Sequence, residues 1–161
     1  MINLVRCDDR LIHGQCMTKI VQHFFIKEII VIDDFTANNA VLKLVFEKAV
    51  PPSMKAAVYR LDNCEEAIKS SITNDVGTLI LFRSPLIAEK LYDLIDELPK
   101  TFMIGPVAKK AGGKEANFGT YLSKEEIDSI VRMVDKNIEP YFQILPEQKR
   151  FNWDDVKGKL I

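Results

Sequence analysis

The chain has 161 residues, of which 47 % are hydrophobic and 28 % charged, and its formal net charge is -1. This length is typical of one domain that buries about 70 % of its unfolded surface, so stability requires neither a disulfide framework nor a structural metal. The balanced charge argues against a nucleic-acid-binding protein, which needs a basic excess. The three cysteines, Cys7, Cys16 and Cys64, lack metal-ligand spacing, and we interpret them as reduced thiols.

Hydropathy along the chain gives an expectation for its location. No apolar run approaches the roughly 20 residues that a transmembrane helix needs. The amino terminus lacks the basic, apolar and small-residue pattern of a secretory signal. We therefore expect a cytoplasmic protein without direct membrane insertion.

Apolar periodicity predicts alternating strands and helices. The predicted strands span residues 2–7, 28–34, 54–61, 76–82, 101–104 and 141–145. The predicted helices span residues 14–25, 36–50, 86–98 and 152–160, with further helices after a cap at Asp62 and after a capping box that begins at Ser123. Residues 105–113 form a basic, flexible loop, and residues 118–122 are expected to pair briefly.

This alternation predicts an α/β fold, a three-layer sandwich with a mostly parallel central sheet and helices on both faces. Right-handed crossovers bring the strand-to-helix loops to the carboxyl edge of the sheet, where such folds bind ligands. Residues 8–13, 33–39, 83–85 and 105–113 should share that edge.

The chemistry indicated there centres on His13, which stands where the first strand leads into a helix. Neutral imidazole is a competent nucleophile toward phosphorus and is the main form of a histidine at cell pH. A helix start with Gly14 and Gln15 offers free amides and a partial positive charge to a phosphate. Arg6 and Arg10 can each present a planar fork of donors to phosphate oxygens. We interpret His13 as a phosphoryl acceptor, Arg10 as its catalytic partner, and Arg6, Gly14 and Gln15 as phosphate-binding.

Residues 6–15, Arg-Cys-Asp-Asp-Arg-Leu-Ile-His-Gly-Gln, resemble the active-site signature of the mannose/sorbose-family enzyme IIB components of the bacterial sugar phosphotransferase system (PTS). The resemblance covers nearly the whole chain and continues through residues 30–34, Ala37-Asn38, Pro51-Pro52, residues 81–85 and Pro146.

The resemblance implies a single IIB domain over residues 1–161 that works as a cytosolic phosphocarrier, peripheral to the membrane transport complex. A phosphohistidine on the IIA partner gives its phosphoryl group to Nδ1 of the histidine that matches His13, which passes it to a sugar imported by the IIC and IID membrane components. Arg10 matches the family's phosphate-stabilising residue. Neither a metal nor a nucleotide cofactor is used, and homo-oligomers are frequent.

Two departures from the family pattern bear on sugar or partner preference. Cys16 stands where an aliphatic residue is common. In the loop after the fifth predicted strand, the glycine pair comes later than in the family, at Gly112-Gly113. The sugar itself is not readable from this chain, because the family recognises it mainly in the membrane components.

Polar residues at the expected edge form a predicted rim around His13: Asp8, Asp9, Asp33, Asp34, Asn38, Arg83 and Ser84. Asp8 and Asp9 either orient Arg10 or His13 or cap the loop. Arg6 has the alternative of a salt bridge with a neighbouring acid. An apolar rim from Leu11, Ile12 or Phe35 would suit transient docking.

Two rival functions use the same edge. The carboxylates of Asp8, Asp9, Asp33 and Asp34 resemble the magnesium pocket of a receiver-type domain, but that domain needs a lysine at the end of the fifth strand and an acceptor acid after the third, and neither is present. A non-catalytic anion-binding or nucleotide-binding module is the other rival, and the first loop lacks the glycine-rich fingerprint that it needs.

Overall fold

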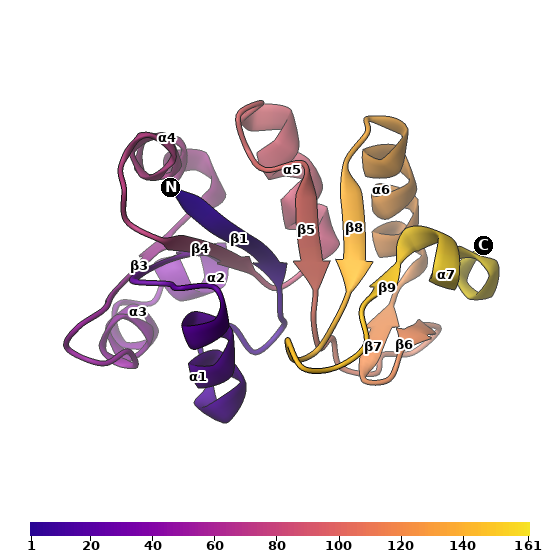
Figure 1. The fold of residues 1–161 in the computed structure, drawn as a ribbon, viewed down its shortest axis with the longest axis horizontal. Coiled ribbons are helices and arrows are strands. Elements are labelled where there is room, and N and C mark those ends of the chain that lie inside the picture. The colour runs from indigo at the N-terminus through magenta and orange to yellow at the C-terminus, as the bar shows by residue number, and fades with distance from the viewer.

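A seven-stranded sheet forms the centre of the computed structural model, which describes residues 1–161 except for the side chains of Gln15 and Cys16. Its strands follow the order β3-β2-β4-β1-β5-β8-β9 (Figure 1). Their bounds are β1 Ile2–Cys7, β2 Glu28–Ile32, β3 Lys55–Tyr59, β4 Thr78–Phe82, β5 Thr101–Ile104, β8 Glu139–Phe142 and β9 Phe151–Asn152. All neighbours pair in parallel except β9, which runs antiparallel to β8. The predicted, mostly parallel sheet is confirmed.

The central strands are apolar because both faces of the sheet are covered. All five residues of β4 are buried, and β2 is buried after its first residue. A strand that is covered on both sides has no solvent face to mark with polar residues, which explains their unbroken apolar runs.

Helices cover both faces, as predicted. The cluster on one face contains residues of α1 (Gly14–His23) and, partly buried, of α3 (Ala40–Lys48). The cluster on the other face contains residues of α4 (Glu65–Thr73), α5 (Pro85–Leu94), α6 (Lys124–Asp135) and α7 (Trp153–Leu160). The fold is therefore a three-layer α/β sandwich.

The helices that follow two adjacent central strands lie on opposite faces of the sheet. α1 follows β1 on one face, and α5 follows the adjacent β4 on the opposite face. Ligands in parallel sheets bind at the carboxyl ends of strands where such a change of face occurs. In Figure 1 the arrowheads of β5 and β8 point down toward the hairpin of β6 (Lys114–Asn117) and β7 (Thr120–Leu122).

Several boundaries differ from those predicted. The helix predicted over residues 36–50 is two helices, α2 (Asp34–Ala37) and α3, because Asn39 accepts hydrogen bonds from the amides of Val41 and Leu42 and starts a new helix. Asp62 does not cap α4: it lies in a 3-10 turn, Leu61–Asn63.

Other elements shift by a few residues. α1 ends at His23 and α5 at Leu94, before the predicted ends at residues 25 and 98. The last parallel strand begins at Glu139 rather than at Tyr141. In the hairpin, residues 118 and 119 form the turn rather than part of a strand. The capping box at Ser123 is confirmed, as is Pro85 in the first turn of α5.

Across the described residues, no helix combines the length and the apolar composition needed to span a membrane.

Candidate active site

The loop after β1 is held at both sides by the neighbouring strands. β1 lies between β4 and β5, so its carboxyl end is fixed in the middle of the sheet. The amide of Asp8 donates to the carbonyl of Phe82 (2.9 Å), and the amide of Asp9 donates to that of Pro106 (3.1 Å). These bonds continue the sheet pairing into the loop and make it a rigid mount for His13.

Leu11 closes a tight turn within this loop. Its amide donates to the carbonyl of Asp8 (3.0 Å), its φ is +57°, and its side chain is fully buried. A left-handed leucine is unfavourable, and burial of its side chain in the core holds it there. Ile12 is also buried, so the prediction of an apolar surface rim is wrong for these two residues; Phe35 is exposed.

His13 stands directly before the first residue of α1. Its backbone is extended (φ -152°, ψ 148°), and its side chain makes no capping hydrogen bond to the helix. The imidazole is 20 % exposed, and its Nε2 lies 3.1 Å from Oδ2 of the buried Asp8. Nδ1 has no hydrogen-bond partner among the groups that the structure describes. A carboxylate on Nε2 favours the tautomer with its proton there, which leaves the Nδ1 lone pair as the nucleophile.

Arg6 lies behind this pair and is fully buried. One of its terminal nitrogens, Nη2, is 3.1 Å from Oδ2 of Asp8, and the same nitrogen donates to the carbonyl of Ile144 (3.1 Å). Nη1 donates to the carbonyl of Gln143 (3.3 Å). The prediction that Arg6 binds phosphate directly is therefore wrong, because its guanidinium is enclosed. The structure shows the alternative, a salt bridge with Asp8.

Gly105, at the end of β5, makes room for that guanidinium. A Cβ on this residue would lie 2.5 Å from Nη2 and 2.7 Å from Cζ of Arg6, a separation that real contacts do not allow. Nη1 of Arg6 also contacts the sulfur of Met103. Sequence reasoning missed these partners and the two carbonyls after β8, because nothing local in the sequence marks a residue that contacts another about a hundred positions away.

Arg10 differs from Arg6 in exposure. Its side chain is 52 % exposed, with Nε 3.8 Å from Oδ1 of Asp8, and its amide donates to the same oxygen (3.2 Å). Asp8 therefore contacts both Arg10 and His13. Gly14 is exposed, and a Cβ on it would meet nothing within 4 Å, which leaves open space at the helix start. The side chain of Gln15, predicted to bind phosphate, lies outside the described residues.

Arg83 joins two of the predicted loops. Its Nε donates to Oδ1 of Asp33 (3.1 Å), and its Nη1 donates to the carbonyl of Asp9 (2.5 Å). The other oxygen of Asp33 caps α2 at Thr36 (3.0 Å), and Asp9 accepts from the amide of Ala108 (2.5 Å). These hydrogen bonds hold together the loops that follow β1, β2, β4 and β5 at the rim of the site.

Other rim residues serve neighbouring loops instead. Asp34 accepts from the amide of Leu61 (2.8 Å), and Asn38 accepts from Arg60 (2.7 Å), so both tie α2 to the end of β3. Ser84 caps α5, and its hydroxyl donates to Glu126 on α6 (2.8 Å). The sequence placed these three residues at the correct edge, but their described contacts do not include His13.

The four carboxylates of the magnesium alternative have separate partners. Asp8 pairs with Arg6 and His13, while Asp9, Asp33 and Asp34 each accept from other groups. In the described part of the chain, no three histidine, cysteine or acidic side chains are grouped as metal ligands.

Cys7 precedes the loop and is fully buried, which raises the pKa of its thiol well above the ordinary value; Glu126 adds to this effect. Burial likewise raises the pKa of Cys64 to about 11. Both therefore remain thiols at neutral pH and are poor nucleophiles. The side chain of Cys16 lies outside the described residues.

The site thus combines a histidine at the carboxyl edge, a buried carboxylate on its Nε2 and an arginine nearby. A family described as the PTS system sorbose subfamily IIB component matches residues 2–160. The chain belongs to this family. The resemblance found in residues 6–15 is thereby confirmed.

Curated relatives of this IIB chain act on different sugars according to their names. The mannose-specific EIIAB component of Escherichia coli strain K12 is 25 % identical over 160 residues, which are 99 % of this chain and 49 % of that protein. The sorbose-specific EIIB component of Klebsiella pneumoniae is 29 % identical over 140 residues, 84 % of this chain and 81 % of that protein. The chain thus spans about half the length of the Escherichia coli relatives that it matches.

Solved structures share the fold of this IIB chain. The IIBSor domain of the sorbose permease from Klebsiella pneumoniae has a TM-score of 0.89 at 23 % identity, covering 100 % of this chain and 98 % of that one. The structure of manxB from Thermoanaerobacter tengcongensis has a TM-score of 0.86 at 29 % identity, covering 99 % and 96 %.

Proposed function

We propose that the chain is a phosphocarrier that accepts a phosphoryl group from a phosphorylated IIA protein on His13 and passes it to a sugar imported by IIC and IID membrane components. One observation carries the proposal: the imidazole at the carboxyl edge is partly exposed, with Nε2 bonded to a buried carboxylate and Nδ1 free of described partners. Family membership supports a phosphotransferase role for the chain.

In the first step, the Nδ1 lone pair of His13 attacks the phosphorus of the donor's phosphohistidine. The donor's P–N bond breaks as the new P–N bond forms, and the donor imidazole leaves with the electron pair. Nε2 of His13 keeps its proton throughout, and Asp8, 3.1 Å away, stabilises the positive charge that develops on the ring.

In the second step, a sugar hydroxyl attacks the same phosphorus. The P–N bond breaks, its electron pair returns to Nδ1, and the hydroxyl proton leaves to a base outside this chain. Phosphoryl transfer of this kind requires mainly positioning and charge stabilisation.

Arg10 supplies the charge at the exposed side of the ring. Its guanidinium is half exposed and lies near Asp8, from which it can turn toward phosphate oxygens at His13. The amides at the start of α1, beside Gly14, add a partial positive charge for the same oxygens.

Arg6 acts through Asp8. Because both groups are buried, the guanidinium offsets the carboxylate's charge and fixes its orientation toward His13. We therefore assign Arg6 a positioning role.

The proposal treats residues 1–161 as one IIB domain in the cytoplasm, peripheral to a membrane transport complex. Its partners are a IIA protein or domain, the IIC and IID components and a sugar. It uses no metal or nucleotide cofactor and binds no nucleic acid. No contact among the described residues favours the receiver-like alternative.

The experiment is incubation with phosphorylated IIA followed by mass spectrometry of the intact protein and its peptides. We expect one acid-labile, base-stable phosphate on His13. It should be lost in His13→Ala and retained in His23→Ala, the matched control at the other histidine. Phosphate on a carboxylate, or none on the folded wild-type protein, would contradict the carrier function.

A further inference from the structure

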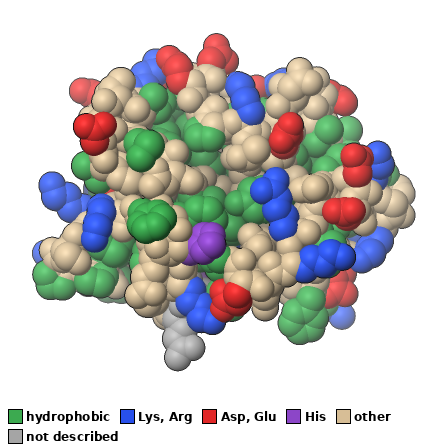
Figure 2. All heavy atoms as spheres, viewed as in Figure 1, with side chains coloured by type: hydrophobic (Ala, Val, Ile, Leu, Met, Phe, Trp, Pro, Cys, Tyr) green, Lys and Arg blue, Asp and Glu red, His purple; other side chains and the backbone are tan. Residues whose placement is uncertain are grey.

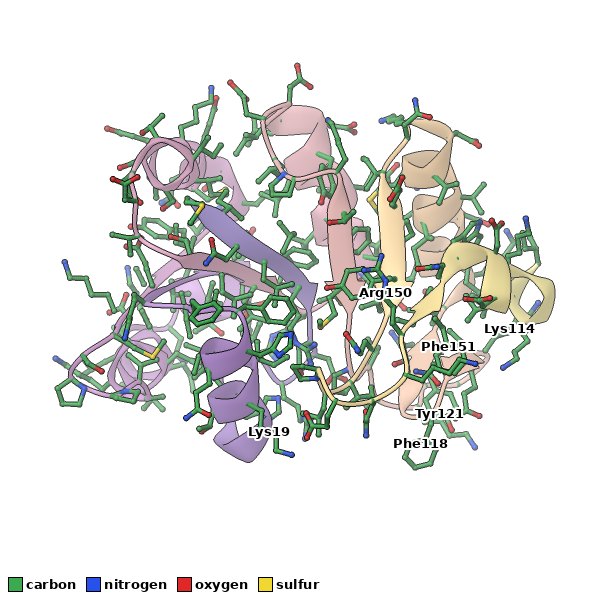
Figure 3. All side chains as sticks on the ribbon, in the orientation of Figure 1. Lys19, Lys114, Phe118, Tyr121, Arg150 and Phe151 are labelled. Carbon is green, nitrogen blue, oxygen red and sulfur yellow. The ribbon has the colours of Figure 1, made fainter. Side chains whose placement is uncertain are left out.

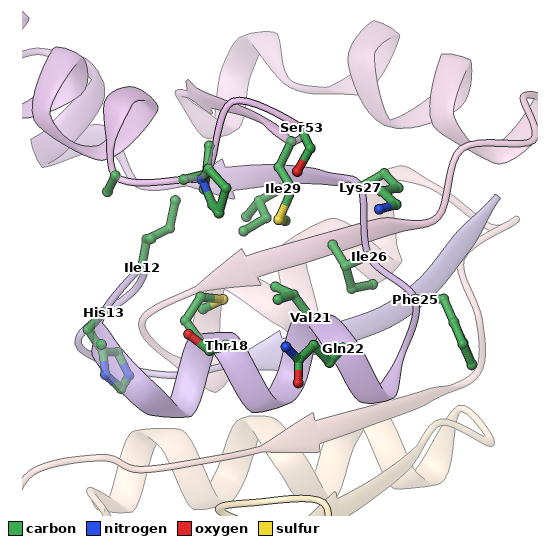
Figure 4. A pocket seen from close by; sticks show the side chains of 16 residues that line it. Ile12, His13, Thr18, Val21, Gln22, Phe25, Ile26, Lys27, Ile29 and Ser53 are labelled. Carbon is green, nitrogen blue, oxygen red and sulfur yellow. The ribbon is translucent and has the colours of Figure 1, made fainter.

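An apolar groove of about 860 Å³ begins at His13 and runs along α1 (Figure 4). One wall is α1, and the other is the connection between α3 and β3. The lining includes Met17 and Val21 from the helix and Val50, Pro51 and Met54 from the connection. A groove of this volume is large enough for a bound ligand or several side chains of a partner.

Phe25 stands at the far end of this groove. Its side chain is 79 % exposed, and its φ is +55°. Two hydrogen bonds that close α1, from its amide to the carbonyl of Gln22 (3.3 Å) and from Ile26 to Val21 (2.8 Å), define a position where glycine is usual. A phenylalanine there is unfavourable twice, since its backbone is left-handed and its ring is in water.

Neighbouring backbone keeps Phe25 in this conformation. A Cβ on Gly77 would overlap the carbonyl oxygen of Phe25, so the two backbones are in close contact. The amide of Lys27 donates to the carbonyl of Gly77 (2.7 Å), and the side chain of Asn3 donates to that of Phe24 (2.8 Å). A strained residue that is held this firmly, with an exposed aromatic ring, is typical of a binding position.

The charge around the groove indicates the chemistry of its occupant. Among the described residues of the lining, none is acidic, whereas His13 and Lys27 supply positive or ionisable groups. Lys27 is exposed and forms no ion pair with any described side chain. An apolar segment with a carboxylate near Lys27 is complementary to this surface.

The position of the groove indicates which partner it suits. It extends from the side of His13 rather than across the imidazole (Figure 4), so an occupant leaves the ring open to a second protein. Figure 2 shows hydrophobic side chains exposed across the middle of the face on which α1 lies, and many charged ones on its right side. A carrier that meets two partners at one atom can hold one of them through such a separate surface.

We propose that this groove, with Phe25 as its anchor, docks an apolar, acid-bearing cytosolic segment of the membrane components that receive the phosphoryl group. The proposal rests on the phosphocarrier function. It adds a docking surface that the transfer chemistry at His13 does not itself require.

The test uses Phe25→Gly in the full chain. Glycine relieves the left-handed strain, so the variant should be at least as stable as the wild type on heating. Sugar phosphorylation is then measured with membrane vesicles that contain the IIC and IID components, as a function of carrier concentration. We expect KM for the carrier to rise about tenfold with kcat unchanged. Loss of an aromatic side chain that becomes buried on docking typically weakens binding by that amount.

Lys27→Glu should raise the same KM, and added salt should reduce the difference from wild type. The matched control is Phe118→Gly, because Phe118 is 87 % exposed at the tip of the β6–β7 hairpin, away from α1 (Figure 3). It should leave KM unchanged.

Several outcomes would overturn the docking proposal. An unchanged KM in Phe25→Gly means that the groove is not used, and a raised KM for phosphorylated IIA alone means that the donor docks there instead. Equal binding to vesicles without IIC and IID indicates a lipid surface, and concentration-dependent dimerisation that Phe25→Gly abolishes indicates a second copy of the chain. If wild-type His13 is not phosphorylated at all, the phosphocarrier function itself fails, which is a separate result.

Discussion

The two arginines of the first loop occupy opposite sides of the same carboxylate. Arg6 is buried behind Asp8 and bonded to backbone carbonyls beyond β8, whereas Arg10 is half exposed in front of it. A buried guanidinium with fixed partners can orient a neighbour but cannot follow an incoming phosphate. An exposed one can turn to meet it. The site therefore has a buried positioning side and an exposed side that can contact the phosphoryl group.

The largest expected effect is on the buried side. Arg6→Met should reduce the free energy of unfolding by about 3–5 kcal/mol, because it leaves the buried Asp8 without its opposite charge. Urea unfolding measures this change, and rapid-quench transfer from phosphorylated IIA should slow as well. Arg6→Lys keeps the positive charge but loses the planar pair of donors, so its stability and transfer rate should lie between those of the wild type and Arg6→Met. Wild-type stability and rate in Arg6→Met would show that Arg6 positions nothing.

A smaller change tests the same side without removing a charge. Gly105→Ala places a methyl group 2.5 Å from Nη2 of Arg6. We therefore expect the free energy of unfolding, measured with urea, to fall by about 1–3 kcal/mol, and phosphorylation of His13 to be slower. The matched control is Gly158→Ala in α7, where a Cβ meets nothing within 4 Å. It should raise stability by about 0.5–1 kcal/mol and leave the rate unchanged. An equal rate loss in both variants would show that the close approach of Gly105 to Arg6 does not control the rate.

The exposed side should show the smallest effect on stability. Arg10→Ala should stay within about 0.5 kcal/mol of wild type in urea unfolding, because its guanidinium is half in water. Rapid-quench transfer should slow about tenfold to a hundredfold, and the rate should lose much of its salt dependence. If the variant transfers at the wild-type rate, Arg10 does not contact the phosphoryl group.

The secondary structure followed from the sequence where its signals were local. Ser123 and Pro85 marked helix starts correctly, because capping depends on a few neighbouring residues. The prediction of a cap at Asp62 is wrong, because the local sequence does not show which partner this carboxylate has. Its carboxylate pairs with Arg60 in a 3-10 turn, and an acid before a helical stretch looks the same whether it caps or not.

The candidate site shows the same division. The sequence placed His13, Asp8 and Arg83 at one edge, because parallel strands end on the same side of a sheet. It gave Arg10 the catalytic role and Arg6 a phosphate-binding role with a salt bridge as the alternative, but it could not show which of the two guanidinium groups is buried. Their difference comes from Gly105 and from the carbonyls of Gln143 and Ile144.

The sequence by itself determined the alternation of strands and helices, the family signature in residues 6–15 and the edge at which His13 lies, because each depends on short-range periodicity or spacing. Only the tertiary structure decided which arginine is buried, which nitrogen of His13 faces Asp8, and where the groove beside α1 begins. Those features depend on contacts between segments far apart in the chain, and burial at one position is set by what packs against it from another.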